Sequence, residues 1–519
     1  RSDKRRSSSH SSNSRKKLLQ EREDSLTKAA TRGTSNISAE SKAAEDRAVQ
    51  RAIDLRRSRE DHRSKEVIEA DEKKRESLLV VTCSPNGAIS TSNALARYFA
   101  EAFEEAFPEQ SVTVLDLADA DLVPPMDDSA MHPTALVPPM DDTASKPASE
   151  GVALVKQFAA HSKFLFAMPM WNLTVPSSLK QYFDLLLHPA HSHLRDKSRG
   201  WNTADCPVTM LATCGNSQLG GEQDFLTPYV NDIFQKLGFR DIRDPVLVNG
   251  SYAERDLPKL LDNAYRMARL QAVNFEFDVS FEMYGTTAPR KKYAVAPEGE
   301  RLTLGPKLLV VKAAQTSEDT ACPDAVASQF SERHLSEAQV DTWVDQAPSV
   351  DTIDVSSLGL THFSRCNTES QFLLWTEVLC FEESSEDDLP AMGSEWVQVE
   401  RVVEPFMRAD CYLFVVPVAH LFVPFRLKQY LDHVLQPVLT YNPRKKITLF
   451  TRKTVCVCTT SEGPLNYSGA DMLTAYLRAV FAGVGFVDIR TAHVDTSVSG
   501  TAGVKAAVDK LSPPFSTLA

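Results

Sequence analysis

The sequence predicts two consecutive α/β domains, each with a five-stranded parallel sheet covered by helices on both faces. Two observations predict this fold: short apolar runs alternate with segments of helical periodicity, and one long stretch occurs twice. FLFAMPMWNLTVPSSLKQYFDLLLHP at 164–189 returns as YLFVVPVAHLFVPFRLKQYLDHVLQP at 412–437. Alternating strands and helices are typical of doubly wound sheets, whose ligands bind beyond the carboxyl ends of the strands.

Composition narrows the class of protein. The formal charge of the 519 residues is −12, yet residues 1–75 hold 21 Lys and Arg against 14 Asp and Glu, so the remainder is near −19. An acidic body argues against nucleic acid as a partner. No apolar run is long enough to predict a membrane span. Nine scattered cysteines in a long chain favour a reducing, cytoplasmic setting.

Four segments follow from the pattern. Residues 1–76 form a charged extension, disordered where Ser, Arg and Lys dominate and helical nearer its end. The first domain is expected at 77–275, a linker at 276–306 and the second domain at 307–519. Within the first domain, the repeat LVPPMDD at 122–128 and 136–142 is interpreted as a tolerated loop insertion.

The expected elements of the first domain alternate regularly. Apolar, β-branched runs predict strands, and 3.6-residue periodicity predicts helices. The strands are expected at 77–82, 111–115, 163–167, 207–212 and 241–248, and the helices at 93–107, 224–237 and 254–274.

The second domain is expected to follow the same order. Its strands at 308–312 and 454–458, its loop at 459–469 and its helix at 471–481 match the first domain, as do two short segments. LTPY at 226–229 corresponds to LTAY at 473–476, and GFRDIR at 238–243 corresponds to GFVDIR at 485–490. The chain is therefore predicted to be a tandem duplication.

Hydroxyl side chains gather between the first strand and the first helix. Ser84, Ser90, Thr91 and Ser92 could donate hydrogen bonds to a phosphate that also meets the amides opening the helix. A simple helix cap would need only one such hydroxyl. Four hydroxyls in nine residues therefore favour an anion site over a cap.

Two further loops follow strands of the same predicted sheet. Met170, Trp171, Asn172 and Leu173 follow the third strand, where Trp171 offers a stacking face and Asn172 a donor and an acceptor. The alternative is that Met170 and Trp171 are core residues. The fourth strand leads into Thr213, Cys214, Gly215 and Asn216. Convergence of three loops on one crevice favours a planar, phosphorylated ligand.

Other candidate sites are weaker. His188, His191 and His193 fit no common zinc spacing, so no metal is expected there. The Gly220-Gly221 pair lacks the remainder of a nucleotide-triphosphate loop. No catalytic acid or base stands out in the sequence.

These motifs resemble a known family. The Ser84 and Ser90–Ser92 loop, PMWNL followed by LKQYFD, and LTPY make residues 77–275 similar to FMN-dependent NADH-azoreductases, within the flavodoxin-like NAD(P)H:quinone oxidoreductases. The resemblance implies that Ser84, Ser90, Thr91 and Ser92 hold the FMN phosphate. It also implies that Met170, Trp171, Asn172 and Leu173 lie along the isoalloxazine, with Thr213, Cys214, Gly215 and Asn216 near its pyrimidine edge.

The resemblance also implies an activity. Such enzymes take a hydride from NADH or NADPH onto FMN and pass electrons to a quinone or azo acceptor, with the cofactor supplying the reactivity. Two departures bear on substrate choice. SHLR at 192–195 replaces the usual aromatic segment, and Gly215-Asn216 replaces a Gly-Gly pair.

The second copy departs further. Its first loop gains Glu318 and Asp319, which oppose an anion, and VAHL at 418–421 lacks the asparagine, so this copy is expected to bind no FMN. The family works as homodimers, so the two copies are expected to form an intramolecular pseudo-dimer. Two alternatives stay open: a flavin-binding scaffold with weak or lost catalysis, and an interaction protein without flavin.

Overall fold

The structure is a computed structural model of the chain. It describes residues 77–118, 150–188, 203–275, 304–360, 397–465 and 471–512, apart from 88–89, 205, 216–217, 252–256, 314–320, 339–347, 436–440, 443–446, 449, 464 and 499. The predictions for the N-terminal extension, the duplicated LVPPMDD loop, most of the linker, His191 and His193 lie outside the described residues.

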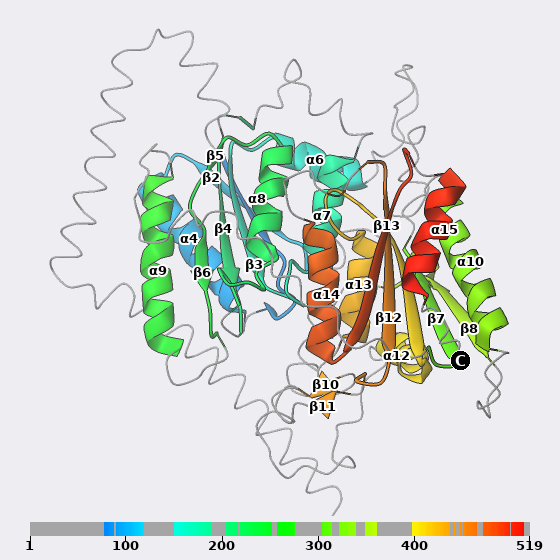
Figure 1. The fold of residues 1–519 in the computed structure, drawn as a ribbon. Helices are drawn as coiled ribbons and strands as arrows, with labels where there is room; N and C mark the ends of the chain where they lie inside the picture. Colours follow the sequence, from blue (N-terminus) through cyan, green and yellow to red (C-terminus); the bar gives the residue numbers. More distant parts are fainter. Residues whose placement is uncertain are drawn as a thin grey trace, which may run out of the picture.

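The first copy forms one parallel sheet in the order β2-β1-β3-β4-β5, with β6 also beside β4 (Figure 1). The predicted strand at 241–248 is in two pieces, so the sheet has one more segment than expected. The other four strands were predicted to within two residues. The bounds are β1 Ser77–Thr82, β2 Ser111–Asp116, β3 Lys163–Pro169, β4 Pro207–Thr213, β5 Asp241–Ile242 and β6 Val246–Val248.

Helices cover both faces of this sheet. Successive side chains of a strand point to opposite faces, and in the central strands both sets of side chains are apolar. Leu78 and Val80 of β1 pack in one cluster with α4 and α9, while Leu79 and Val81 pack in another with α6, α7 and α8. The helix predicted from Asn93 begins two residues earlier. The helices are α4 Thr91–Ala106, α6 Glu150–Ala159, α7 Ser177–Leu187, α8 Leu226–Lys236 and α9 Leu257–Asn274.

The second copy repeats the plan. Its parallel sheet has the order β8-β7-β9-β12-β13, which matches the first sheet strand for strand. The two parallel sheets and their helices confirm the predicted fold class. The strands are β7 Lys307–Lys312, β8 Ser349–Asp354, β9 Cys411–Pro417, β12 Thr454–Ser461 and β13 Asp488–Asp495, with a small separate pair of strands, β10 Tyr441–Asn442 and β11 Ile447–Thr448.

The helices of the second sheet divide between its faces in the same way. Residues of α10 and α15 join one apolar cluster, and those of α12, α13 and α14 join the other. The short helix η6 Val355–Leu358 follows β8. The bounds are α10 Ala321–Ala338, α12 Val397–Arg408, α13 Phe425–Val434, α14 Met472–Val484 and α15 Gly500–Leu511.

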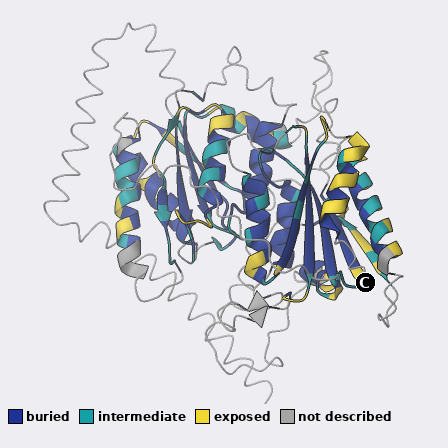
Figure 2. Ribbon diagram, viewed as in Figure 1, coloured by how far each residue is buried: buried dark blue, intermediate teal, exposed yellow. Residues whose placement is uncertain are grey.

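The two copies meet through α7 and α13, which lie between the sheets (Figure 1) and are buried along their lengths (Figure 2). Aromatic rings continue the junction. Tyr229 lies 4.8 Å from Phe422 between ring centroids, and Phe422 lies 4.6 Å from Tyr476. One apolar cluster contains residues of both copies, so the core is continuous across the junction.

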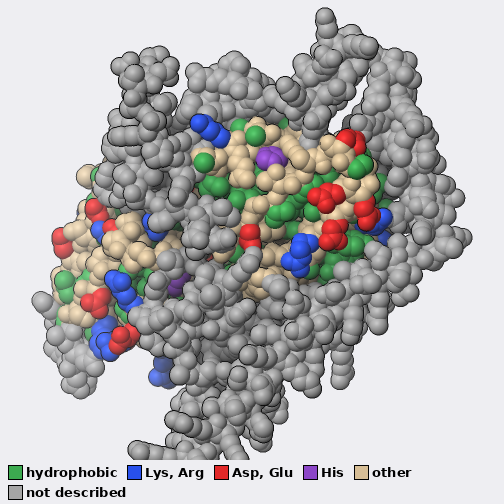
Figure 3. All heavy atoms as spheres, turned by 180° about the vertical axis from the view of Figure 1, so that it is seen from behind, with side chains coloured by type: hydrophobic (Ala, Val, Ile, Leu, Met, Phe, Trp, Pro, Cys, Tyr) green, Lys and Arg blue, Asp and Glu red, His purple; other side chains and the backbone are tan. Residues whose placement is uncertain are grey.

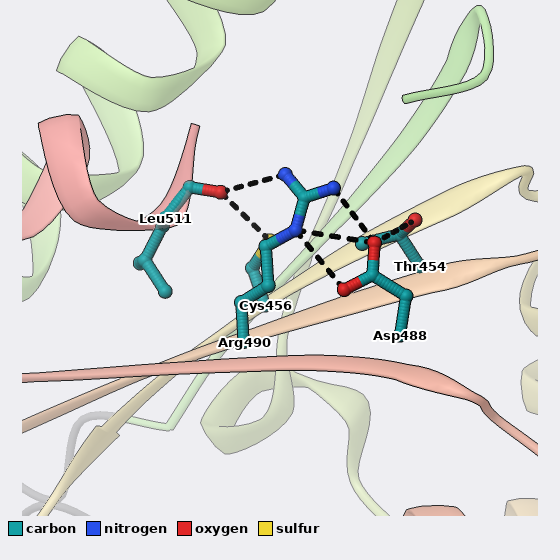
Figure 4. A network of polar contacts seen from close by, with 5 residues as sticks. All are labelled: Thr454, Cys456, Asp488, Arg490 and Leu511. Atoms are coloured by element: carbon teal, nitrogen blue, oxygen red, sulfur yellow. Dashed lines mark hydrogen bonds and ion pairs between the residues drawn. The ribbon is translucent and has the colours of Figure 1, made fainter. Parts of the chain in front are cut away.

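A buried ion pair lies in the second sheet, beside the end of the last helix (Figure 4). Arg490 Nη2 lies 2.7 Å from Asp488 Oδ2, and both side chains are 3% exposed. Thr454 Oγ1 donates to the same carboxylate oxygen over 3.1 Å, and Arg490 Nη1 donates to the Leu511 carbonyl over 2.9 Å. The pair therefore joins β12, β13 and the end of α15.

On the face opposite to the view of Figure 1, acidic and basic side chains lie interspersed over the described surface (Figure 3). Among the described residues, no helix is both long and apolar enough to cross a bilayer.

Candidate functional site

The first loop brings buried hydroxyl groups to the start of α4. Ser84, Ser90, Thr91 and Ser92 are each at most 5% exposed. Ser90 is the N-cap of α4: its Oγ accepts the Asn93 amide over 3.2 Å and lies 3.1 Å from Ser92 Oγ. One hydroxyl therefore caps the helix, and the other three are additional to that task.

The electrostatics of this loop suit an anion. The amides at a helix N-terminus carry partial positive charge, and the first turn of α4 has no acidic residue to neutralise it. Thr91 Oγ1 is buried and has no hydrogen-bond partner among the described residues. Since a buried hydroxyl is normally satisfied, this group fits a site whose partner is a ligand oxygen. The residues present thus fit a phosphate group.

The turn after β3, Met170–Leu173, is called the ring turn here. Asn172 and Leu173 have φ values of 46° and 67°, in the left-handed region that non-glycine residues rarely adopt. The turn is closed by the backbone N–H of Trp171, which donates to the Thr174 carbonyl over 2.7 Å. Backbone strain at such a position is sustained only where the surroundings hold it, and it is common at ligand sites.

The third loop contacts the ring turn. The Met170 amide donates to the Thr213 carbonyl over 2.7 Å, and Cys214 Sγ lies 3.7 Å from Met170 Sδ. Thr213 is the last residue of β4, although it was predicted to begin the loop. Gly215 follows, and Asn216 lies outside the described residues.

Strands β1, β3 and β4 are parallel neighbours, so all three loops leave the same edge of the sheet. Of the twelve predicted residues, ten follow these strand ends, Thr213 ends β4 itself, and Asn216 lies outside the described residues. The contact of the ring turn with the third loop is direct, and the first loop leaves the adjacent strand.

Sequence reasoning missed the charged groups that lie behind the ring turn. Lys180 and Asp184 of α7 form a buried ion pair, and Lys428 and Asp432 of α13 form its counterpart. The four side chains are at most 2% exposed. The repeated LKQY and Asp of the two helices carried the signal, but a Lys and an Asp four residues apart are usually a solvated helical pair.

Each ion pair reaches across to the other copy. Lys428 Nζ donates to the Trp171 carbonyl over 3.3 Å, and the Asn172 amide nitrogen donates to Asp432 Oδ1 over 2.9 Å. The turn after β9, Val418–Leu421, is called the matching turn here. Lys180 Nζ donates to the Ala419 carbonyl there over 3.4 Å, and His420 Nδ1 donates to Asp184 Oδ1 over 2.7 Å.

The two carboxylates differ electrostatically. Burial raises the pKa of Asp432. The opposing effects of Lys428 and of the neutral Asn172 amide are smaller, so this pKa lies above its usual value. Burial also raises the pKa of Asp184, but Lys180 and His420 outweigh it and hold that pKa below its usual value. Burial lowers the pKa of both lysines, against the pull of their aspartates.

The corresponding edge of the second sheet is less suited to an anion. The first turn of α10 contains Asp324, which pairs with Lys312 at 2.8 Å. His420 and Leu421 repeat the left-handed conformation, with φ values of 47° and 71°. Glu318 and Asp319, predicted to oppose a phosphate, lie outside the described residues. Among the described residues, no group of acidic, histidine and cysteine side chains could hold a metal ion.

Comparison with known proteins agrees with the duplicated architecture. The family described as flavodoxin-like fold matches the chain twice, at residues 76–269 and 323–512. The chain belongs to this family. The two matches confirm the tandem duplication, and the second flavodoxin-like match begins after β7, inside α10.

Relatives of this flavodoxin-like chain have about the length of one copy. The FMN-dependent NADH:quinone oxidoreductase of Nitratidesulfovibrio vulgaris is 31% identical over 207 residues, which cover 37% of this chain and 97% of the relative. The FMN-dependent NADH:quinone oxidoreductase of Pectobacterium atrosepticum is 31% identical over 170 residues, covering 32% and 83%. A solved azoreductase from Bacillus anthracis str. Sterne is 20% identical, with a TM-score of 0.33, and covers 38% of this chain and 100% of that one.

Proposed function

We propose that the chain is an FMN-dependent oxidoreductase whose single active site lies in the first copy. The proposal is carried by one observation: buried hydroxyls in excess of the helix cap, with Thr91 Oγ1 unpartnered, stand at the same sheet edge as a strained turn containing Trp171. The relatives named as FMN-dependent NADH:quinone oxidoreductases support the cofactor, the NADH donor and the quinone acceptor. The name of the Bacillus protein is the basis for an azo acceptor.

The residues of the first copy have distinct tasks in this proposal. Ser84, Ser90, Thr91 and Ser92 donate hydrogen bonds to the FMN phosphate, together with the amides of α4. Met170, Trp171, Asn172 and Leu173 would hold the isoalloxazine, and Thr213, Cys214, Gly215 and Asn216 would contact its pyrimidine edge. FMN, when bound, accepts a hydride from NADH or NADPH and passes two electrons to a quinone or azo compound.

The second copy is proposed to bind no FMN and to complete an intramolecular pseudo-dimer. The contacts of α7 with α13 and the reciprocal ion pairs support a two-fold arrangement of the copies. Asp324 in the first turn of α10 and His420 in place of an asparagine support the loss of flavin binding there. One flavin per chain is therefore expected.

The test is to purify the full chain, identify and count released flavin, and follow flavin absorbance during anaerobic addition of NADH and NADPH. One FMN per chain, bleached by the nucleotide and reoxidised by a quinone or an azo dye, is expected. A colourless protein that added FMN does not restore contradicts the proposal. A yellow protein that neither nucleotide bleaches supports the alternative of a flavin-binding scaffold.

The position of the site is tested by Ser90→Asp. Aspartate caps a helix about as well as serine, so α4 should remain intact. The added carboxylate lies beside the proposed phosphate and should weaken FMN binding at least about tenfold through like-charge repulsion. Fluorescence titration with FMN measures the affinity, and the circular dichroism spectrum checks the fold. Unchanged affinity would place the flavin elsewhere.

A further inference from the structure

The ring turn of the first copy is held from outside that copy. Two hydrogen bonds join α13 to the ring turn, and a third joins α13 to the start of α7. Lys428 Nζ donates to the Trp171 carbonyl, the Asn172 side-chain amide donates to Asp432 Oδ1, and the Ser177 backbone amide donates to Asp432 Oδ2 over 3.3 Å. Both oxygens of one carboxylate therefore bind the segment that carries the ring turn.

The reciprocal contacts, from α7 to the second copy, include one hydrogen bond fewer. Lys180 and Asp184 hold the matching turn through the Ala419 carbonyl and His420 Nδ1. The second oxygen of Asp184, Oδ2, is buried and has no hydrogen-bond partner among the described residues. The position that matches Ser177 is Phe425, and its amide makes no such bond to Asp184. The larger of the two sets of hydrogen bonds therefore holds the copy with the proposed flavin site.

The hydrogen bonds of Lys428 and Asp432 hold the strained part of the ring turn. Asn172 and Leu173 both have positive φ, a conformation that persists only where several contacts determine it. Lys428 fixes the direction of the Trp171 carbonyl, and Asp432 fixes the rotation of the Asn172 amide. These two groups lie on the turn that would face a flavin ring.

We infer that Lys428 and Asp432 of the second copy are positioning residues for the flavin site of the first copy. This inference rests on the proposed function, since it concerns the same site. It explains why the second copy keeps the Lys and Asp of its helix while its own turn has become Val418-Ala419-His420. The helix acts on the other copy's turn, so its two charged residues remain necessary after its own turn has lost the asparagine.

The test removes each ion pair without leaving a lone buried charge. Replacing both partners of a buried pair with apolar residues of similar volume is often neutral or stabilising, so the variants should fold. The two variants are Lys428→Met with Asp432→Leu in the second copy, and Lys180→Met with Asp184→Leu in the first. The second variant is the matched control, because it removes the same kind of pair from the copy that contains the site.

The measurements on the full chain are the dissociation constant for FMN, the visible spectrum of bound FMN and its midpoint potential. The Lys428/Asp432 variant should bind FMN at least about tenfold more weakly and shift the spectrum or potential. The Lys180/Asp184 variant should stay within about twofold of the wild-type affinity. Thermal midpoints of the apo proteins check that both variants fold to a similar extent.

The outcomes separate the inference from the proposed function. Wild-type chain that binds no FMN contradicts the proposed function. Wild-type chain that binds FMN, with both variants unchanged or both weakened equally, overturns the inference and leaves the function standing. If a double variant does not fold, Asp432→Asn is compared with Asp184→Asn under the same readouts, and equal effects again overturn the inference.

Discussion

At the scale of single residues, the junction between the copies is unusual for the charge that it buries. A Lys and an Asp four residues apart on a helix are ordinarily exposed, and their interaction then contributes only about 0.3–0.5 kcal/mol. Here both such pairs are almost completely buried, because each helix is covered by its counterpart. Single substitution of either aspartate therefore leaves a buried lysine uncompensated, which costs about 3–5 kcal/mol.

His433 predicts a pH dependence of stability. It is buried in α13, its Nδ1–H donates to the Gln429 carbonyl over 2.8 Å, and burial lowers its pKa to about 4. The unfolded chain binds a proton near pH 6.5 that the folded chain does not bind, so stability falls as the pH drops from 6.5 towards 4. By linkage, this group should remove about 2 kcal/mol between pH 7.5 and pH 5.

The substitution His433→Leu tests this dependence, since Leu185 holds the matching position of the first copy. Urea unfolding of wild type and variant at pH 7.5 and pH 5 measures the change. The variant should lose less stability on acidification, by about the 2 kcal/mol assigned to the imidazole. An identical loss in the two proteins would show that His433 titrates normally in the folded chain.

The ring turn marks the limit of what could be predicted at this scale. The position of Trp171 and Asn172 after a strand followed from the sequence, since a buried apolar run ends at Pro169. The left-handed conformation of two successive residues, Asn172 and Leu173, did not follow, because leucine rarely adopts positive φ even though asparagine does so more readily. That conformation depends on long-range contacts, which a local pattern does not contain. The twelve site residues stay a prediction until flavin binding is measured.

At the scale of elements, one ion pair occurs in both copies with different burial. Arg490 and Asp488 on β13 are each 3% exposed, whereas Arg243 and Asp241 are 16% and 33% exposed. The free energy of an ion pair depends strongly on this difference. Arg490→Ala should therefore destabilise the chain by about 3–5 kcal/mol, because the buried Asp488 carboxylate loses its compensating positive charge.

The matched control is Arg243→Ala, which should cost no more than about 1 kcal/mol since water can solvate Asp241. Chemical unfolding at pH 7 gives both free energies. Equal losses would mean that burial does not set the contribution of these pairs. A larger loss for Arg243→Ala would contradict the prediction outright.

The elements were predictable where their local signals were strong. The run LLVV of β1 gave that strand its observed bounds, and the other long strands of the first copy differed by one or two residues. The strand expected at 241–248 is divided into β5 and β6, and Pro245, which has no backbone N–H to donate to β4, lies between them. In the second copy, β8 and α10 were not predicted individually, since their apolar residues are fewer or less regularly spaced. Helix α12 was also missed, although its apolar residues recur at helical spacing.

At the scale of the whole molecule, the continuous core predicts joint unfolding of the two copies. One apolar cluster includes residues of α6, α7 and α8 together with α12, α13 and α14. Separation of the copies would expose that apolar cluster to water, so a state with one folded copy should be sparsely populated. Hydrogen exchange should give amides of α7 and α13 the same free energy of opening.

Hydrogen exchange of the Arg490→Ala variant provides the control for this coupling. Although the substitution lies in the second copy, it should reduce protection in α7 as much as in α13. Protection that falls in α13 alone would show that the copies unfold independently. The same result would weaken the proposal of an intramolecular pseudo-dimer.

The covalent joining of two copies has a consequence for how the protein can change over generations. In a symmetric assembly of identical subunits, every substitution is made at both equivalent places at once. Here Asn172 and His420 occupy equivalent places and can be altered separately. Drift should therefore be tolerated in the matching turn, which no proposed ligand touches. It should be restricted at Lys428 and Asp432, whose task lies in the neighbouring half of the same chain.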